Sequence, residues 1–254
     1  MAAQFVRVEA FSVKESQRIL GEASRDAAFC SHVSNPEAPR WWIGSPETIA
    51  DAIKTHMSIP VPYRSKSGKL FSRQPRSDHR ALLGGVLSWP VPMDQISLPQ
   101  NKSLAKQLFL WMRASIEWLM EKFGKHLQGV CSHADETYPH LHMLAVGDAN
   151  MLHPGLQAEF EGGKRLSNRK EKKRRYRAAM RLFLDDYFQK VGSKFGLERS
   201  TGRRPLSRIK DRAVANRVLD LEKKLADVED VEARDMLDKI VEDAPKRPRQ
   251  GMVF

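Results

Sequence analysis

The sequence predicts an α+β fold, and three observations lead to this class. Apolar and polar residues alternate with the period of a strand in "QFVRVEAF", close to the N-terminus. Apolar residues recur at helical spacing over residues 103–123. Two strand-like segments, "LQGVCSH" and "HLHMLAV", flank the polar stretch "ADETYP", which is typical of a β-hairpin. Strands and helices are therefore mixed along the chain.

The remaining elements can be placed in order. A helix is expected after the first strand, and "CSHVSNPEAPRWWIGSPE" is expected to be a loop because it is rich in Ser, Pro and Asn. Ser45 then caps a short helix that begins at Pro46. Residues 58–79 contain several prolines and basic residues and predict a long basic loop. "ALLGGVLSWPV", residues 81–91, predicts a buried strand.

Length and charge restrict the classes of function. The 254 residues suit one large domain or a domain with an appendage. The 43 Lys and Arg exceed the 31 Asp and Glu, and the formal net charge is +12. Such a balance indicates a polyanionic partner, with nucleic acid first, an acidic membrane surface second and a merely solubilising charge third.

The cysteines and the apolar runs indicate the compartment. Cys30 and Cys131 are too few for a disulfide framework. The N-terminal segment lacks the apolar core of a secretory signal, and no apolar run reaches the roughly 18 residues of a membrane span. We therefore expect a reduced, cytoplasmic protein without membrane insertion.

The densest group of metal-ligating residues lies between His133 and His142. Residues i and i+2 of a strand share a face, so His140 and His142 project together, and the incoming strand can bring His133 beside them. Three imidazoles leave a coordination position open for substrate or water, as a catalytic divalent metal requires. The acids Asp135 and Glu136 lie between them, which makes a purely structural role for the histidines hard to sustain.

The segment "HADETYPHLH" resembles the signature His-x-Asp-Glu-x-x-Pro-His-x-His of the Mob/Pre (MobV-type) plasmid mobilisation relaxases, a group within the HUH endonucleases. Other segments agree in order: a first strand followed by a turn with Arg25, then "SNPE", "RALLGGVLSW", the long helix, and finally "KFGLERSTGRRPLSRIK". The resemblance covers about residues 4–212, and only the signature is highly specific.

The resemblance implies a fold and an activity. The fold would be a mainly antiparallel central sheet, with the histidine pair on a central strand and helices packed behind. Such a relaxase binds plasmid DNA at an origin of transfer, as a hairpin plus single strand, nicks one strand and retains its 5′ phosphate, working with the conjugation machinery. The relaxase-like domain would span residues 1–212, followed by a charged helix over 213–244 and a basic tail over 245–254.

The resemblance also implies roles for individual residues. His133, His140 and His142 would be the metal ligands, and Mn²⁺ or Mg²⁺ would polarise the scissile phosphate. Glu136 would be the proton-transferring acid or lie just behind the ligands. Asp135 would hydrogen-bond a ligand histidine and fix its tautomer.

One position departs from the family. Relatives carry His-x-x-Arg after the first helix, and the histidine there attacks the phosphate, whereas this chain has "EASR", Glu22 to Arg25. Attack by a carboxylate would form a labile acyl phosphate. His32 is the best alternative nucleophile, with Ser24 and Ser31 behind it, although an exposed loop histidine is an equally good interpretation.

The segment "KRLSNRKEKKRRYR", residues 164–177, has nine basic residues and one acid. A charged run is often only a solvated helix face, but its position after the metal-site segment favours a phosphate-binding track. The expected DNA-binding residues, including two from the later basic stretch, are Lys164, Arg165, Arg169, Lys170, Lys172, Lys173, Arg174, Arg175, Arg177, Arg203 and Arg204.

Beyond this run the charge reverses. Residues 220–243 hold ten acids and four bases, and apolar residues keep a heptad-like spacing over 214–228. This spacing predicts a helix that packs on the body of the protein or pairs with another chain.

Three function classes remain open. The first is a metal-dependent relaxase, and the second is a DNA-binding derivative without strand transfer. The third is a metal-dependent hydrolytic nuclease that uses an activated water.

Overall fold

The computed structural model describes residues 3–65 and 67–199. The chain divides into two units, Met1–Arg199 and Ser200–Phe254, and only the first is described here. The predicted charged helix, the basic tail, Arg203 and Arg204 lie outside the described residues.

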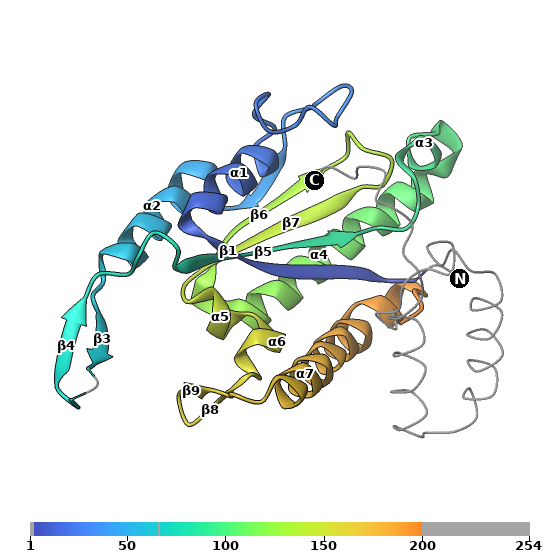
Figure 1. Cartoon of the computed structure of the whole chain (residues 1–254). Coiled ribbons are helices and arrows are strands. Elements are labelled where there is room, and N and C mark those ends of the chain that lie inside the picture. The colour runs from blue at the N-terminus through green and yellow to red at the C-terminus, as the bar shows by residue number, and fades with distance from the viewer. Residues whose placement is uncertain (1–2, 66, 200–254) are drawn as a thin grey trace, which may run out of the picture. The chain divides into compact units, whose positions relative to one another are not determined.

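The first unit is built on a five-stranded sheet with the strand order β1-β5-β7-β6-β2 (Figure 1). Every neighbouring pair in this sheet is antiparallel. The α+β prediction and the antiparallel central sheet are confirmed, and the strand that carries the histidine pair lies in the centre. The strands, in sheet order, are β1 Phe5–Ser12, β5 Arg80–Ser88, β7 His140–Val146, β6 Leu127–His133 and β2 Arg40–Ile43.

Helices cover both faces of the sheet. On one face, α1 (Val13–Ala23) and α2 (Pro46–Ser58) pack against Leu82, Leu144 and Val146. On the other face, the longer helices α4 (Lys102–Phe123) and α7 (Arg169–Lys190) share a larger core with the alternate residues of β7. Short elements connect them: α3 Met93–Ile96, η1 Pro99–Asn101, η2 Gly124–His126, α5 Ala149–Leu152, α6 Pro154–Gln157 and η3 Gly192–Phe195.

Local sequence explains where the principal helices begin. The Ser12 side chain accepts a hydrogen bond from the backbone N–H of Glu15, and the Glu15 carboxylate accepts one from the backbone N–H of Ser12. This capping box starts α1. Ser45 caps α2 as predicted, with Pro46 at the first helical position. Asn168 caps α7 by accepting from two backbone N–H groups.

A buried polar contact joins α4 to α7. The Trp111 indole donates to the hydroxyl of Tyr187 at 2.9 Å, deep in the larger core. Burial raises the pKa of Tyr187 to about 12, so this hydroxyl stays protonated and neutral. The pair satisfies two polar groups that would otherwise be buried without partners.

Two of the predicted loops contain strands. Residues 58–79 were expected to be a loop, but β3 (Val61–Arg64) and β4 (Leu70–Arg73) form a two-stranded ribbon. Its one proline, Pro62, is compatible with a strand because a two-stranded ribbon has an unpaired edge on each side. Strand β2 also lies within an expected loop, because its pairing with β6 is a contact distant in sequence that local composition does not reveal.

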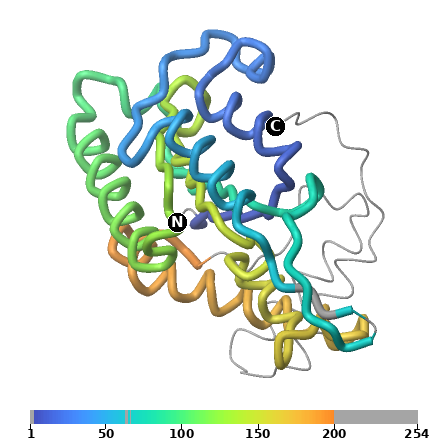
Figure 2. Tube along the Cα trace, turned by 90° about the vertical axis from the view of Figure 1, so that its left-hand side faces the viewer, coloured from blue at the N-terminus to red at the C-terminus, as the bar shows by residue number. Residues whose placement is uncertain are grey.

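The ribbon β3–β4 projects from the end of α2, away from the main sheet (Figures 1 and 2). A smaller ribbon of β8 (Phe160–Glu161) and β9 (Lys164–Arg165) precedes α7. Both ribbons lie at the end of the molecule opposite the β6–β7 loop.

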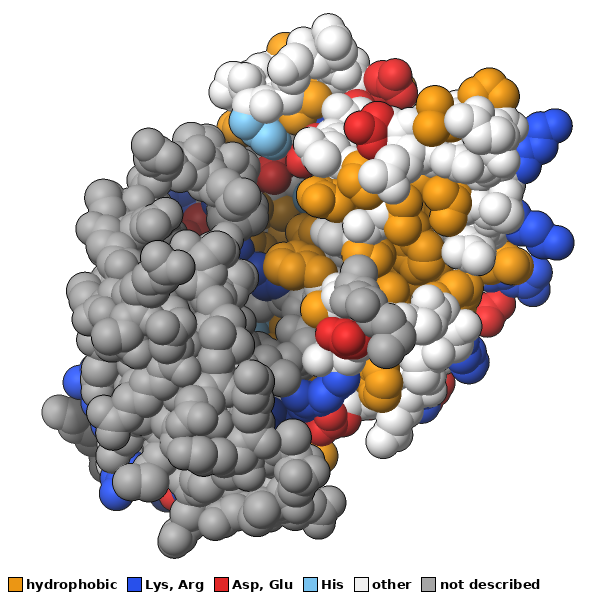
Figure 3. Space-filling view, turned by 90° about the vertical axis from the view of Figure 1, so that its right-hand side faces the viewer, with side chains coloured by type: hydrophobic (Ala, Val, Ile, Leu, Met, Phe, Trp, Pro, Cys, Tyr) orange, Lys and Arg blue, Asp and Glu red, His pale blue; other side chains and the backbone are white. Residues whose placement is uncertain are grey.

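Apolar and basic side chains occupy different parts of the surface. On the face drawn in Figure 3, apolar side chains form a patch and Lys and Arg lie along its right-hand edge. Large apolar side chains that are exposed include Leu98, Phe109 and Leu110. Within the described residues, no helix combines the length and apolar character needed to cross a membrane.

Candidate metal centre

Strand register brings the three predicted histidines together. His133 of β6 lies directly opposite His140 of β7, and Cys131 lies opposite His142. Ring centroids are separated by 5.2 Å for His133–His140, 4.6 Å for His133–His142 and 5.0 Å for His140–His142. All three side chains are buried, on the sheet face covered by α1 and α2. The β6–β7 hairpin therefore groups the three histidines on one face of the sheet, as the sequence predicted.

Backbone carbonyl groups orient two of the rings. His133 Nε2 lies 2.9 Å from the carbonyl oxygen of Ala23, and His140 Nδ1 lies 3.0 Å from that of Tyr138. A carbonyl only accepts, so these nitrogens carry the protons and donate. The lone pairs are thereby left on His133 Nδ1 and His140 Nε2.

The remaining nitrogens fit a cation. His140 Nε2 and His142 Nε2 lie 3.1 Å apart. His133 Nδ1 is buried and has no hydrogen-bond partner within the described part of the chain. One ligand atom from each histidine can be chosen so that all three lie within 4.8 Å of one another. These features, a buried orphaned acceptor and converging lone pairs, are those of a metal-binding group.

Two of the rings, those of His133 and His142, are held in the neutral form. Burial lowers the pKa of His133 to about 4, although its bond to Ala23 opposes the shift. Burial, followed by the nearby His140 and His133, lowers the pKa of His142 well below its ordinary value. Neutral imidazole is the form that binds a metal, so the environment prepares these ligands near neutral pH.

A buried ion pair closes the site on the loop side. Arg25 Nε and Nη2 donate to the two oxygens of Asp135 at 2.8 and 2.6 Å, and Nη2 also donates to Glu136 Oε1 at 2.8 Å. The Asp135 carboxylate accepts in addition from the backbone N–H of Glu37 at 3.1 Å. The expectation that Asp135 bonds a ligand histidine is therefore wrong, because its hydrogen bonds go to Arg25 and Glu37 and backbone carbonyls orient the rings.

Glu136 lies closest to the ligands among the predicted acids. Its Oε1 is 3.7 Å from His140 Nε2, and its side chain is 35% exposed. It therefore lies between the histidine group and solvent. Its proton-transferring role stays a prediction.

The predicted site residue Arg25 is buried in an ion pair. Its side chain is only 3% exposed and is committed to two carboxylates. It is also the one described non-glycine residue with positive φ, 59°. A left-handed residue at the end of α1 turns the chain sharply, which directs the guanidinium to the β6–β7 loop. Sequence patterns contain no signal for this conformation.

The two candidate nucleophiles lie in different environments. Glu22 is in the last turn of α1 and buried, and burial raises the pKa of its carboxyl group. His32 lies on the exposed loop after α1. His32 is near enough to Glu22 and His142 to influence the pKa of each.

Sequence reasoning missed two contributors to the site. Cys131 lies beneath His133, with Sγ 3.9 Å from its Nε2, and burial raises the thiol pKa to about 12. The second is the carbonyl of Ala23 at the C-terminal end of α1, where the helix dipole favours positive charge. The pairing register of β6 with β7 would have revealed Cys131, because it shares a face with His133.

The predicted phosphate-binding residues lie away from the histidines. Helix α7 packs in the core on the opposite sheet face, and its basic first half begins beside α6. Tyr176, within that half, has its ring 5.5 Å from that of His153, just before α6. The basic run therefore does not line the histidine group, and its role as a phosphate-binding track stays a prediction.

Several of these basic residues are paired with acids. Arg174 and Arg175 both form ion pairs with Glu171 at 2.8 Å, and Arg165 pairs with Glu159 at 2.6 Å. Lys164, Arg169 and Lys170 are exposed. A bound phosphate would have to compete with the acids at the paired arginines.

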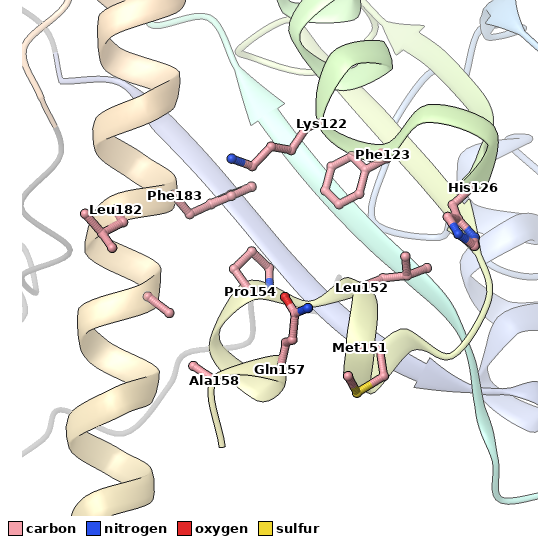
Figure 4. Close-up of a pocket in the computed structure, with 11 residues that line it drawn as sticks. Lys122, Phe123, His126, Met151, Leu152, Pro154, Gln157, Ala158, Leu182 and Phe183 are labelled. Atoms are coloured by element: carbon pink, nitrogen blue, oxygen red, sulfur yellow. The ribbon is translucent and has the colours of Figure 1, made fainter. Parts of the chain in front are cut away.

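A pocket of about 510 Å³ lies elsewhere, between α4, α5, α6 and α7 (Figure 4). Phe123 and Phe183 line it from the two long helices, and Met151 and Pro154 from the short ones. Phe123 and Phe183 belong to the core on the face opposite the histidines. The pocket is thus distinct from the metal centre.

Comparisons with known proteins give matches among solved structures. No protein-family model matches the chain, and no curated protein matches its sequence. One match is the MobM relaxase domain (MOBV; Mob_Pre) bound to plasmid pMV158 oriT DNA (22 nt), in its Mn-bound crystal structure at pH 5.5. It is 17% identical in sequence, and the TM-score is 0.47. The match covers 79% of this chain and 91% of that chain. The 23-nt complex is 15% identical, with a TM-score of 0.46 over 86% and 99%. The conjugative relaxase TrwC with oriT DNA, metal-bound, is 11% identical, with a TM-score of 0.37 over 96% and 92%.

Proposed function

We propose that this chain is a metal-dependent plasmid mobilisation relaxase that binds an origin of transfer and nicks one DNA strand for conjugative mobilisation. The observation that carries the proposal is the buried trio of His133, His140 and His142 on paired strands, with two of its rings oriented by backbone carbonyls. The signature segment in which the trio lies supports the choice of DNA as substrate.

The trio would hold a divalent cation, Mn²⁺ or Mg²⁺. When bound, such an ion polarises a phosphodiester and stabilises the charge that develops on it during displacement. The residues of the chain position the ligands. The carbonyls of Ala23 and Tyr138 fix the tautomers of His133 and His140, and burial lowers the pKa of His133 and His142.

Arg25 acts as a positioning residue in this proposal. It is buried and joined to Asp135 and Glu136, so it holds the loop between β6 and β7 against the end of α1. This contact keeps Glu136 within 3.7 Å of His140. Glu136 is then placed to accept and return a proton at the edge of the site.

We assign the nucleophilic attack to His32. Its imidazole nitrogen would form a bond to phosphorus, and the bond from phosphorus to the 3′ oxygen of the preceding nucleotide would break. The 5′ phosphate stays on the protein, and the proton lost from the imidazole reaches the 3′ oxygen through Glu136. Buried Glu22 is a poor alternative because its raised pKa favours the neutral acid, and an acyl phosphate would be labile.

Incubation with a supercoiled plasmid, followed by a denaturing gel, tests the proposal. The plasmid should carry the DNA that flanks the gene, with Mn²⁺ present, and should be compared with a chelated control. A covalent band of protein with the 5′ end of the cut strand is expected. A free nick would favour the hydrolytic nuclease, and binding without cleavage would favour the DNA-binding derivative.

The DNA contacts in this proposal divide between two regions. The histidines, through the cation that they bind, would hold the scissile phosphate. The exposed Lys164, Arg169 and Lys170 would hold another part of the same DNA. Cations at the N-terminal end of α7 reinforce the helix dipole there, and both attract phosphate. The conjugation machinery would meet the resulting protein–DNA complex.

A further inference from the structure

A second pair of histidines faces each other far from the trio. His56 Nε2 of α2 and His79 Nε2, just before β5, lie 3.4 Å apart. The ring centroids are 5.5 Å apart, and the ring planes differ by 28°. Both side chains are half-buried. Since β5 runs from this pair to the strand end opposite His140, the two histidine groups are separated by roughly 25–30 Å of strand.

The geometry of this pair matches that of two ligands on one cation. In the trio, His140 and His142 have Nε2 atoms 3.1 Å apart and centroids 5.0 Å apart, values close to those of the second pair. Two nitrogens bound to Zn²⁺ at about 2.0–2.1 Å in tetrahedral geometry are separated by about 3.3 Å. The observed 3.4 Å spacing therefore needs little movement to accept an ion.

We propose that His56 and His79 form a second divalent-metal site, independent of the trio, which clamps the base of the β3–β4 ribbon. Imidazole ligands favour Zn²⁺, Ni²⁺ or Cu²⁺ over Mg²⁺. Water completes the coordination, because each histidine contributes one nitrogen. This proposal does not depend on the nicking activity.

Both ligands lie on backbone that is already held in place. His56 is in the last turn of α2, and its carbonyl accepts from the N–H of Ile59 at 3.3 Å. The carbonyl of His79 accepts from the N–H of Val13 at 3.2 Å, and its N–H donates to Arg76 at 2.9 Å. Little backbone ordering is thus required when an ion binds.

Asp148 and His126 lie near the pair. Both act on the pKa of His56, Asp148 by raising it and His126 by lowering it, so both lie within electrostatic reach. Asp148 caps α5 and supplies negative charge near the proposed cation. His126 Nδ1 donates to the carbonyl of Val146 at 2.9 Å, which leaves its Nε2 as an acceptor.

A cation bound by His56 and His79 would close the loop that contains the β3–β4 ribbon. The residues between His56 and His79 contain the whole β3–β4 ribbon. An ion that joins the two histidines closes this loop at its base, and a cross-link of this kind reduces the freedom of the segment it encloses. The ribbon and its turn carry exposed basic side chains, among them Lys69 in the turn and Arg73 in β4, so the clamp would fix the direction of a basic arm.

Metal stoichiometry tests the proposal. Equilibrium dialysis of the tag-free full chain against Ni²⁺, followed by metal analysis, is expected to give two ions per chain for the wild type. His56→Ala should give one, the His140→Ala/His142→Ala variant should give one, and the combined variant none. Thr55→Ala, an exposed neighbour on α2, is the matched control and should keep both ions.

Two results would overturn the proposal: the same number of ions on His56→Ala as on the wild type, or no ion on the His140→Ala/His142→Ala variant. Because His56→Ala can alter α2, hydrogen exchange provides a second measurement. Ni²⁺ should slow exchange within residues 57–78 of the wild type and leave it unchanged in His79→Ala. Equal slowing in both proteins would also reject the site, whereas failure of the nicking assay would leave each of these readouts intact.

Discussion

Arg25 and Asp135 are separated by 110 positions in the sequence and form a two-point ion pair in which both side chains are nearly inaccessible, 3% and 1% exposed. The pair joins the end of α1 to the loop between the two histidine strands. Arginine suits this role because its planar guanidinium can donate to both carboxylate oxygens at once. The single ammonium group of a lysine could not match this geometry.

Removing one partner of this pair should be costly. Arg25→Met leaves Asp135 buried without its counter-charge, and we expect unfolding free energy to fall by about 3–5 kcal/mol in urea denaturation. Arg113→Met is the control, since the Arg113–Glu117 pair is exposed, and should cost less than about 1 kcal/mol. The double variant Arg25→Met/Asp135→Leu should lose less than the sum of its single changes, and simple additivity would contradict the coupling.

Metal binding should depend on the histidine trio. His140→Ala or His142→Ala is expected to abolish tight Mn²⁺ binding in calorimetry, with far-UV circular dichroism unchanged. Tyr138→Phe is the matched control, because Tyr138 orients His140 through its backbone carbonyl and its side chain is exposed. Unchanged Mn²⁺ affinity in both histidine variants would refute the assignment.

The nucleophile can be identified from the adduct. If His32 attacks, His32→Ala should abolish the covalent protein–DNA band, whereas Glu22→Ala should retain it. Glu22→His places an imidazole three residues before Arg25 and should create a second site of attachment. Peptide mapping of the trapped adduct distinguishes the two positions, and a wild-type adduct on Tyr63 or Tyr176 would rule out both.

DNA affinity should be mostly electrostatic. Replacing Arg169 and Lys170 with Gln should flatten the slope of log affinity against log salt by roughly 0.7–0.9 for each phosphate that the protein no longer neutralises. The same charge change at the exposed Lys102 and Lys106 of α4 serves as the comparison. Equal slopes in the two variants would mean that the start of α7 is only a solvated surface.

The anchoring of α7 on α4 should depend on pH. Asp186 Oδ2 accepts from the Trp118 indole at 2.8 Å and from Lys122 at 3.0 Å. Burial raises the pKa of Asp186, but these hydrogen bonds outweigh it, and the pKa is lowered overall. A lowered pKa stabilises the fold above the unfolded value of about 3.9, and this contribution is lost as the pH falls through the folded pKa.

Asp186→Asn should therefore lower stability by about 1.5–3 kcal/mol at pH 7, the range for hydrogen bonds to a charged group. The difference from the wild type should narrow as the pH drops below about 4, where the native carboxylate also becomes protonated. Thermal melts across pH 3–7 measure this. Glu117→Gln, at an exposed pair, should show a much smaller difference, and a pH-independent gap for Asp186→Asn would contradict the argument.

The sequence by itself determined the elements whose signals are local. The period of two in β1, the helical spacing in α4 and the cap at Ser45 were all predicted and confirmed. The grouping of the histidines also followed from local pattern, because residues i and i+2 of a strand share a face and a short hairpin leaves few registers. The function of that group remains a proposal from its chemistry.

Only the tertiary structure decided which groups from distant segments meet. The pairing of β2 with β6, the left-handed Arg25 that reaches Asp135, and the carbonyl of Ala23 on His133 all join positions far apart in the chain. The basic run of α7 follows the histidine strands closely in sequence, but the sheet separates the two groups. Local propensity and spacing act over a few residues, whereas burial and pairing across the sheet select the contacts between segments.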